Sequence, residues 1–489
     1  MKKIASLPLT VIALLVIASV VFAAASAPGT GWWSGEQIQN VGAGSANVEI
    51  KAYDSASSST YLANKTIASG GSATFLPADF TGMPSGFQGS AVVSSTEEIR
   101  AIVNVTNRLA GSYGVAGGLA AAQYQGMNQG DSTLNFPLAK NDYYGKTTTF
   151  YIQNAGNTAA TAAVTFNMGG SSYNYTTPSI GPGQMVSVSP VDASAPSSGL
   201  GSMTVTSAQP LAGSVLEHKT SENPATLLQA TRGFTSTDSD TTVYAPIIKN
   251  SFYNRFTGLQ VQNTGGSAIN ITVTYKSSIP GCSVTDSATS VPAGASHTFV
   301  HLPGLTNLPI SCLASAKVVG TGPVVAIVNE SYISSYVASG HSQESTTYSA
   351  APDSSKTVKL SAPLYKENSY NKGTGLQVQN VGSSNATNVV LAFSGPTGTY
   401  TTVPQTIAAG SSLTFVNVRN KSASFWNGTA MTPAALGCTT SGCGSNGVFG
   451  VTITADQPVV AIANESTYPF TAPLISQDKN NYEGFNLTP

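Results

Sequence analysis

The sequence predicts an all-β protein built from four tandem antiparallel β-sandwich modules, joined in an elongated array. The first observation is a phrase, Gln-Asn, that closes an apolar segment four times, at intervals of 114, 109 and 117 residues. Self-similarity at domain-sized spacing indicates one repeated unit. The second is the alternation of apolar and polar residues, typical of half-buried strands. The third is the recurrence of turn residues roughly every 8–12 positions. The four phrases end at Asn40, Asn154, Asn263 and Asn380.

Each module is expected to open with a short strand around a proline, placed 17 residues before the Asn of the phrase. The strand that ends in Gln-Asn comes next, then a turn and a second alternating run such as residues 271–275. Proline removes a backbone donor, so it favours an edge or the start of a strand. The proline segments are Phe136-Pro137-Leu138, Ala245-Pro246-Ile247 and Ala362-Pro363-Leu364.

A glycine turn and a final hairpin complete each module. Glycine at a fixed place indicates a backbone that needs positive φ. The glycines are Gly70, Gly183, Gly294 and Gly410. The hairpins join residues 91–93 to 101–103, 203–205 to 213–215, 317–319 to 326–328, and 451–453 to 461–463. Helical periodicity is suggested only at residues 119–125, in a connection.

The strand, turn and second strand of each module resemble bacterial immunoglobulin-like cell-surface modules of the cell-adhesion-related (CARDB-like) kind. The residues that carry the resemblance, over about half of each module, are Gln262-Asn263-Thr264-Gly265 with 270–275 and 292–296, and Gln379-Asn380-Val381-Gly382 with 409–412. Modules one and two match less well. The resemblance implies immunoglobulin-like sandwiches and a location at the cell surface, and it assigns no site.

The N-terminus reads as a secretory signal. Lys2 and Lys3 precede an apolar run over residues 7–22, and Ala25-Ser26-Ala27 provides small residues for cleavage. An uncleaved membrane anchor is the alternative, although the run is short for a spanning helix. The predicted divisions are 1–27 signal peptide, 28–132 module one, 133–241 module two, 242–356 module three, and 357–489 module four with an insertion and a tail.

Composition narrows the function. Charged residues make up 9% of the chain and the net charge is −1, so no basic surface for nucleic acid is expected. Four cysteines in an exported chain favour disulfides. Pairing within modules is the simplest arrangement, although the sequence permits three disulfide connectivities. A metal site is the alternative to disulfides. The disulfide candidates are Cys282, Cys312, Cys438 and Cys443.

Reactive clusters are not apparent in the sequence. The histidines are scattered, and the chain is expected to be non-enzymatic, with no catalytic residue, cofactor or metal. A glutamate recurs just after the hairpin in three modules, at Glu217, Glu330 and Glu465. It is either a shared ligand for an ion or sugar or, more simply, a polar residue where the strand meets solvent. Ligand-contact candidates are Trp32 and Trp33, which otherwise cap the first sandwich, and Trp426, an exposed aromatic expected in a disulfide-stapled loop.

Module one has no complete proline strand ahead of it, because 17 residues before Asn40 lies inside the leader. Ala472-Pro473-Leu474-Ile475, near the other end, resembles such a strand. One hypothesis makes Pro473, Leu474 and Ile475 an assembly tail that adds to module one of another copy, giving a head-to-tail polymer. The alternative is that the tail packs on module four, because residues 482–485 match 124–127 and 231–234.

The expected function is therefore that of a secreted structural or adhesive protein of the cell surface or extracellular matrix. The alternative is an array of carbohydrate-binding modules that dock on polysaccharide, and an uncharacterised hydrolase is a third, weaker reading. The expected partners are the chain itself or cell-surface glycans. No membrane span is expected once the leader is removed.

Overall fold

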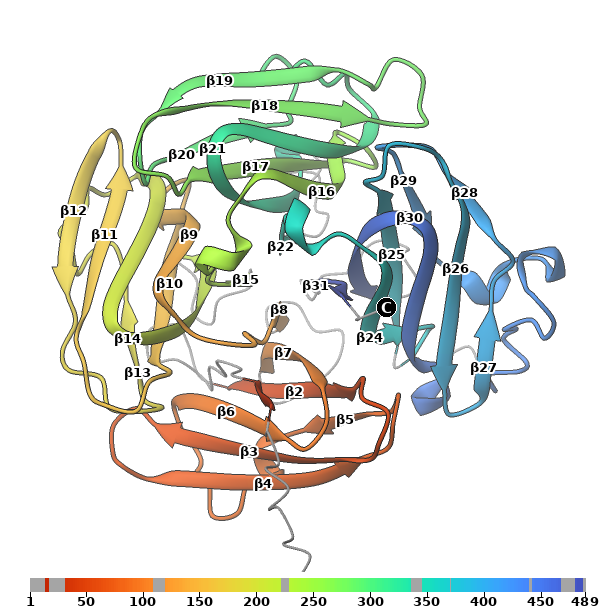
Figure 1. Ribbon diagram of the computed structural model, residues 1–489, viewed down its shortest axis with the longest axis horizontal. Coiled ribbons are helices and arrows are strands. Elements are labelled where there is room, and N and C mark those ends of the chain that lie inside the picture. The colour runs from red at the N-terminus through yellow and green to blue at the C-terminus, as the bar shows by residue number, and fades with distance from the viewer. Residues whose placement is uncertain are drawn as a thin grey trace, which may run out of the picture.

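The computed structural model describes residues 14–16, 31–108, 119–220, 228–335, 345–369, 371–438, 442–467 and 480–486. The protein is all-β, and its sheets are antiparallel. Strands consecutive in the sequence gather into four groups, which Figure 1 shows as four sectors around a common centre. No helix in these ranges is long and apolar enough to span a membrane.

The first group holds two four-stranded sheets, ordered β1-β6-β3-β4 and β5-β2-β7-β8. Alternate residues of both sheets, such as Ile38 and Val48, point into one shared core. Its elements are β1 Leu14–Val16, β2 Trp32–Asn40, β3 Ala46–Asp54, β4 Thr60–Ile67, β5 Ser72–Phe75, η1 Pro77–Asp79, β6 Gly89–Ser95, β7 Ile99–Arg108 and β8 Leu119–Gln125.

The second group is built on one long strand, β14, which pairs with β9 and β11 along its first part and with β10 and β15 along its second. A single strand thereby serves both faces of a core that contains Phe136, Phe150 and Phe166. Its elements are β9 Asp131–Asn141, β10 Lys146–Asn154, β11 Ala162–Met168, β12 Ser171–Thr176, β13 Met185–Val188, β14 Gly199–Lys219 and β15 Leu228–Arg232.

The third and fourth groups repeat this plan, with β21 and β30 as the long strands. The third comprises η2 Ser236–Asp238, β16 Asp240–Asn250, β17 Arg255–Asn263, β18 Ile269–Lys276, β19 Thr285–Val291, β20 Ser296–Val300, β21 Cys312–Tyr332, β22 Ser345–Ser349 and β23 Ala351–Pro352. The fourth comprises η3 Asp353–Ser355, β24 Thr357–Lys366, β25 Lys372–Asn380, β26 Ala386–Gly395, β27 Gly398–Thr401, β28 Gln405–Ile407, β29 Ser412–Phe415, η4 Val418–Asn420, η5 Ala423–Phe425, η6 Gly444–Gly447, β30 Val448–Thr467, β31 Asn480–Glu483 and β32 Phe485–Asn486.

The recurring asparagine has the same structural role in every group. Asn263 is fully buried, and its Nδ2 donates to the carbonyls of Ser267 (2.7 Å) and Val291 (3.0 Å) while its Oδ1 accepts the N–H of Gly265 (2.9 Å). Buried backbone groups need such partners. The same three bonds form at Asn40, Asn154 and Asn380.

The glutamine before that asparagine reaches the neighbouring group. Gln262 Nε2 lies 3.1 Å from the carbonyl oxygen of Gly294 in its own group and 3.4 Å from that of Met203 in the preceding group. Gln153 and Gln379 bond in the same way to Ala91 and Ala316. The Gln-Asn phrase therefore recurs because Asn ties two turns of its own group and Gln ties adjacent groups.

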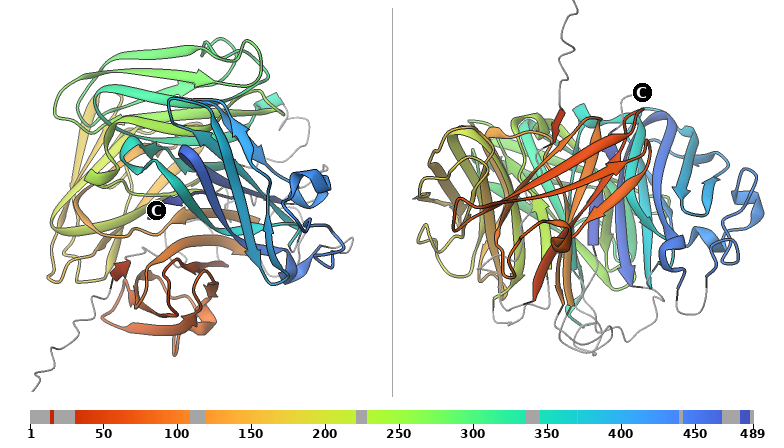
Figure 2. Two further views of the ribbon diagram at one scale, coloured as in Figure 1. Left: turned by 45° about the vertical axis from the view of Figure 1, so that its right-hand side comes forward. Right: turned by 90° about the horizontal axis from the view of Figure 1, so that it is seen from below.

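The groups close into a ring, so the expected elongated array is wrong. Each inner strand contacts the next, in the cycle β8, β15, β22, β31 and back to β8, and these strands surround the centre in Figure 1. Ser361 Oγ in the fourth group donates to Gln39 Oε1 in the first at 2.5 Å, across 322 residues of sequence. The side view in Figure 2 shows the groups standing at one level. The prediction of an elongated array failed because it did not consider that the strands of one group can pack against those of the next group.

Side chains also cross these boundaries. Ile102 of the first group packs in the core of the fourth, and Ile462 of the fourth packs in the core of the third. Tyr151 and Leu216 of the second group lie in the core of the first. Hydrophobic burial between groups is a main driving force for their association.

Residues 119–125, the one suggested helix, are the strand β8, because they complete a sheet beside β7. The end of the chain packs on its own group: β31 pairs with β30, and β32 pairs with β24. That arrangement is the self-packing alternative for residues 482–485. Pro473, Leu474 and Ile475 lie outside the described residues, as does nearly all of the leader.

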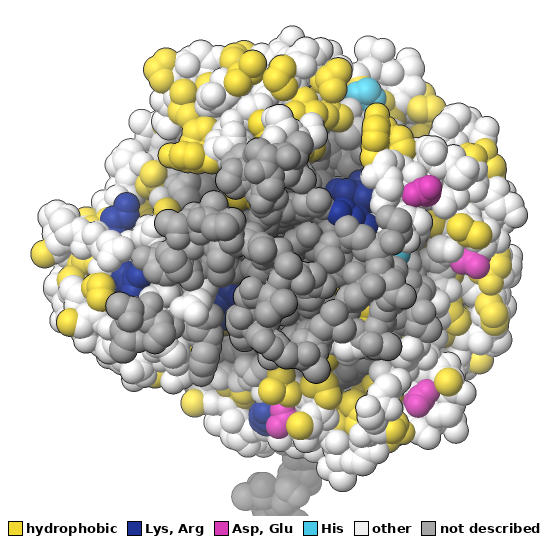
Figure 3. Space-filling model, turned by 180° about the vertical axis from the view of Figure 1, so that it is seen from behind, with side chains coloured by type: hydrophobic (Ala, Val, Ile, Leu, Met, Phe, Trp, Pro, Cys, Tyr) yellow, Lys and Arg dark blue, Asp and Glu magenta, His cyan; other side chains and the backbone are white. Residues whose placement is uncertain are grey.

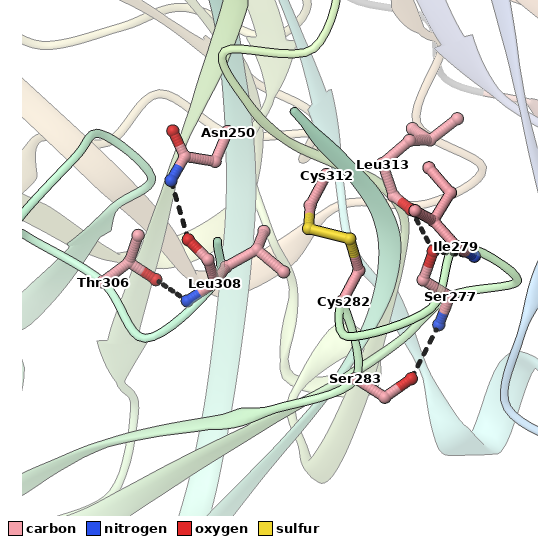
Figure 4. The surroundings of a disulfide bond; sticks show 9 residues. All are labelled: Asn250, Ser277, Ile279, Cys282, Ser283, Thr306, Leu308, Cys312 and Leu313. Atoms are coloured by element: carbon pink, nitrogen blue, oxygen red, sulfur yellow. Dashed lines mark hydrogen bonds between the residues drawn. A yellow bond between two sulfur atoms is a disulfide. The ribbon is translucent and has the colours of Figure 1, made fainter. Parts of the chain in front are cut away.

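Two disulfides join the cysteines within single groups. Cys282, in the loop after β18, is bonded to Cys312 at the start of β21 (Figure 4). Beside it, Asn250 Nδ2 donates to the Leu308 carbonyl at 2.7 Å and thereby holds the separate loop between β20 and β21. Cys438 is bonded to Cys443 in the fourth group.

Candidate ligand cleft between the first and fourth strand groups

The four boundaries between groups share one hydrogen-bond pattern, with one exception. Ser202 Oγ donates to the Gly294 carbonyl of the next group at 2.7 Å. Ser90 and Ser315 make the same bond to Gly183 and Gly410. At the fourth boundary the equivalent residue is Gly450, which has no hydroxyl to donate to the turn at Gly70. The boundary that closes the ring is thus built differently, and Ser361 and Gln39 bridge it instead.

A large cleft lies along this fourth boundary, with a volume of ≈ 1140 Å³. Its volume is slightly above the range of about 300–1,000 Å³ usual for small-molecule sites. Its walls come from the first group on one side and the fourth on the other. The lining residues are Trp33, Gly35, Gln37, Ser69, Gly70, Gly71, Ser72, Thr74, Leu76, Asn104, Thr106, Ala121, Leu364, Lys366, Lys372, Ser394, Gly395, Pro396, Ser445, Val448, Phe449, Gly450 and Glu465.

The first-group wall includes one face of β2. Trp33, Gly35 and Gln37 alternate along that strand, so their side chains share the face that looks into the cleft. A Cβ at Gly35 would lie 3.3 Å from the Trp33 ring and 3.1 Å from both Leu76 and the Phe75 carbonyl. Glycine therefore preserves the space beside the indole ring. Gln37 Oε1 accepts a hydrogen bond from Thr74 at 2.5 Å, which fixes the orientation of its amide.

The fourth-group wall carries the charge of the cleft. Lys366 Nζ lies 2.8 Å from Glu465 Oε2, and Glu465 is 4% exposed. Lys372, which also lines the cleft, leaves two cations against one carboxylate there. The remaining lining residues are neutral, and most are glycine, serine, threonine, asparagine or glutamine.

Glu465 belongs to a repeated set of buried glutamates, which corrects the expectation that they meet solvent. Glu330 is 1% exposed and lies 2.7 Å from Lys249 Nζ and 2.9 Å from Arg255. In the second and third groups the cluster draws one cation from the proline strand and another from the next strand, so three elements meet at one carboxylate. In the second group, Glu217 pairs with Lys140 at 2.8 Å and Lys146 at 3.2 Å.

Titration of these groups follows their surroundings. Burial alone would raise the pKa of Glu217, but the charges of Lys140 and Lys146 lower it to about 2. Burial lowers the pKa of Lys140 despite the neighbouring carboxylate. The glutamate is therefore ionised at neutral pH and acts as a structural anion between two lysines.

The first group has a different buried carboxyl. Glu36 is fully buried, and neither of its carboxylate oxygens has a hydrogen-bond partner among the described residues. Burial, with a smaller contribution from the charge of Asp79, raises the pKa of Glu36 to about 8. Ser34 Oγ, two residues earlier on β2, is also buried without a partner in the described part of the chain. Glu36 points into the sandwich, on the face of β2 opposite the cleft.

The structure separates the ligand-contact candidates. Trp33 lines the cleft. Trp32 is 8% exposed and packs in the core of the first group, which matches its expected alternative role as a cap. Trp426 is 4% exposed and meets Phe393, Phe425 and Tyr400 edge-on, so the expected exposed aromatic is wrong. The insertion that carries Trp426 is long enough to fold back onto its own group, and this packing buries the side chain.

Most of the cleft was missed in the sequence because its walls are about 300 residues apart. One signal was available. When the modules are aligned on the first strand of the final hairpin, at Val93, Val205, Val318 and Ile453, Gly450 stands where the other three carry serine. That difference marks the fourth boundary as unlike the rest, although it does not reveal a cleft.

Figure 3 shows the face opposite that of Figure 1, where few charged side chains appear among neutral ones. No group of three or more His, Cys, Asp or Glu side chains that could hold a metal ion occurs in the described ranges. His301, which is fully buried, lies 2.8 Å from the Tyr275 hydroxyl and 2.8 Å from the Thr257 carbonyl oxygen, so it is part of the core.

No protein-family model and no curated protein matches the chain. Among solved structures, it is similar to Thermotoga maritima 1070, with 20% identity and a TM-score of 0.20, over 22% of this chain and 96% of that one. It is also similar to an α-L-rhamnosidase of Streptomyces avermitilis solved with L-rhamnose, with 10% identity and a TM-score of 0.10, over 91% of this chain and 57% of that one. Both TM-scores are low, so neither likeness bears on function.

Proposed function

We propose that the protein is a secreted, non-enzymatic adhesive component of the cell surface or extracellular matrix, and that it binds carbohydrate in the cleft between the first and fourth groups. The observation that carries this proposal is the cleft itself. It combines one tryptophan, a wall of neutral hydrogen-bonding groups and few charges. Sugars present hydroxyl groups at their edges and C–H groups on their faces, and such a lining complements both.

Trp33 is the residue proposed to stack on a sugar ring. Tryptophan offers a large flat apolar surface together with one N–H donor. A Cβ at Gly35 would lie 3.3 Å from the Trp33 ring, so glycine leaves space beside that part of the indole. Across the cleft, Lys366 and Lys372 favour a ligand with hydroxyl or carboxylate groups over a cationic one. The proposed ligand class is therefore a neutral or weakly acidic glycan.

Binding without catalysis is supported by the chemistry of the lining residues. Glu465 is the one carboxylate among them, and it is held by Lys366. Glycoside hydrolysis usually needs two carboxyl groups on opposite sides of the bond. The lining residues also include no histidine or cysteine that could act as a base or nucleophile.

We further propose that the four groups are four copies of one immunoglobulin-like module. Support comes from the three hydrogen bonds that recur at each asparagine and from the repeated long strand of the later groups. The two disulfides are compatible with an oxidising, extracellular location. In this proposal the ring acts as a rigid holder for the cleft at its closing boundary.

The test is a binding assay on insoluble polysaccharides and a glycan array, with wild type and Trp33→Ala. We expect retention of wild type on at least one polysaccharide and a loss of about tenfold or more in Trp33→Ala, equivalent to about 1.4 kcal/mol. Leu305→Ala is the matched control, because Leu305 is 66% exposed and does not line the cleft. Equal retention of Trp33→Ala and Leu305→Ala, or no binding by wild type, would refute the glycan proposal.

A further inference from the structure

The proline strands β9, β16 and β24 have a fixed place in their groups. Each pairs with the long strand of its own group in one common register. These strands are 10 or 11 residues long. We call this place the first-strand position. The equivalent Cα pairs are Leu134 with Val205, Val243 with Val318, and Leu360 with Ile453.

In the first group this position is filled by the leader. β1, only three residues long, pairs with β6. Val16 lies opposite Val93, which is the same register as the three pairs above. A segment predicted to be removed on export therefore occupies a strand that every other group supplies from its own sequence. The edge of β6 is a strand-accepting edge.

The side chains beneath this position are adapted to a strand that the first group lacks. In the third group, Thr257 Oγ1 accepts the backbone N–H of Lys249, on the first strand, at 3.0 Å. Thr148 and Thr374 do the same for Lys140 and Lys366. The equivalent residue in the first group is Ser34, whose buried hydroxyl has no partner among the described residues. A strand backbone at this position would supply one.

Two more differences follow from the same absence. The buried glutamate cluster is replaced, with Val105 where Glu330 stands and Trp32 where Arg255 stands. Glu36 takes the place of the apolar Phe150, Leu259 and Leu376, and its carboxyl is buried without a partner in the described ranges. An incoming strand with a backbone or side-chain donor would meet both Ser34 and Glu36.

We propose that the first-strand position of the first group is an assembly site, held by the leader in the precursor and taken by an extended strand from a second copy of the chain after the leader is removed. The sequence contains a further proline segment that resembles the three used as first strands. Ala472-Pro473-Leu474 matches Ala362-Pro363-Leu364 residue for residue. We assign it as the donor strand, bound by β-augmentation along β6. The proposal does not depend on glycan binding.

Mass by light scattering after size exclusion, with negative-stain microscopy, tests this directly. The proteins compared are the secreted form that begins at residue 28 and the full chain. We expect the secreted form to give concentration-dependent oligomers and the full chain to stay monomeric. A secreted form that remains monomeric at every concentration would overturn the proposal.

Two variants of the secreted form separate acceptor from donor. The acceptor variant carries a copy of residues 131–145, with Lys140→Met, joined ahead of Trp32, so that the group supplies its own first strand. We expect it to be monomeric, with a raised Tm. The donor variant carries Pro473→Ser, Leu474→Gly and Ile475→Ser, and we expect it to be monomeric at every concentration, with the Tm that the secreted form shows when it is dilute and monomeric. Oligomers that persist in either variant would contradict the assignment of these two segments.

Discussion

The first and third strand groups differ in the residues that they bury beside the first strand. In the third group, a buried glutamate, Glu330, joins a cation from the first strand to one from the next. In the first group, the first strand is reduced to β1, and Val105 and Trp32 occupy the glutamate and cation positions. The glutamate and one of its two cations are exchanged together. The comparison teaches that the ion cluster belongs to the first strand, because a buried charge without its partners is costly.

The largest expected effect comes from breaking one cluster. Glu330→Gln removes the buried carboxylate that pairs with Lys249 and Arg255, and we expect a loss of about 3–5 kcal/mol in the free energy of unfolding. Urea denaturation followed by fluorescence measures it. The control is Glu98→Gln, which removes a more exposed pair with Arg100 and is expected to cost about 1 kcal/mol or less. Equal losses in the two variants would contradict the buried-cluster account.

The same clusters predict a dependence on pH. The pKa of Glu217 is about 2 in the folded protein against a usual 4.5. A depressed acid pKa contributes stability that is present above pH 4.5 and is lost as the pH falls toward 2, by up to about 1.4 kcal/mol per pH unit. Stability measured over this range in wild type and in Glu217→Val with Lys140→Met and Lys146→Trp tests the sign. The triple variant, which takes Val and Trp from the first group and replaces the remaining lysine by an apolar residue, should show a shallower fall.

The asparagine of the Gln-Asn phrase should contribute equally to stability in the first and third groups. Asn263→Ala removes three buried hydrogen bonds, with an expected cost of about 2–4 kcal/mol at roughly 1 kcal/mol for each. Asn40→Ala in the first group loses the same three bonds. Thermal unfolding of both variants should show similar losses. A much smaller loss at Asn40 would mean that the first group tolerates looser turns than the others.

Removing the buried carboxyl of the first group should stabilise it. Glu36→Leu introduces the residue found at the equivalent Leu259 and Leu376, and we expect a gain of about 2 kcal/mol at pH 7. The pKa of Glu36 is raised to about 8, so the wild type loses stability as the pH rises from 4.5 to 8, whereas the variant does not. The gain should therefore grow with pH, and a gain that shrinks would contradict burial of this group.

The smallest effect is expected at the closing boundary. Gly450→Ser restores the serine found at the other three boundaries. A Cβ there would lie 3.0 Å from Gln39 Nε2, at the mobile end of a side chain. We expect a change of about 1 kcal/mol or less in either direction. Because Gly450 lines the cleft, glycan affinity in this variant should change more than stability does, which a paired binding and unfolding measurement shows.

The sequence predicted strands, turns and repeats well because these depend on local alternation and on residues such as Asn263 and Gly294. It also indicated that Trp32 could cap a core. The ring, the cleft and the buried glutamates depend on contacts between modules. Glu330 looked like a solvent-facing residue because its cations are 75 and 81 residues away. Trp426 looked exposed because the folding of a long insertion onto its own core leaves no periodic signal.

The most direct test of the ring is small-angle X-ray scattering of the full chain under conditions where it is monomeric. A compact particle of 489 residues should have a radius of gyration of about 23 Å. Four modules of about 110 residues placed end to end would give about 40 Å. A value near 23 Å is what the closed ring predicts. A value near 40 Å would contradict the ring, and with it the cleft between the first and fourth groups.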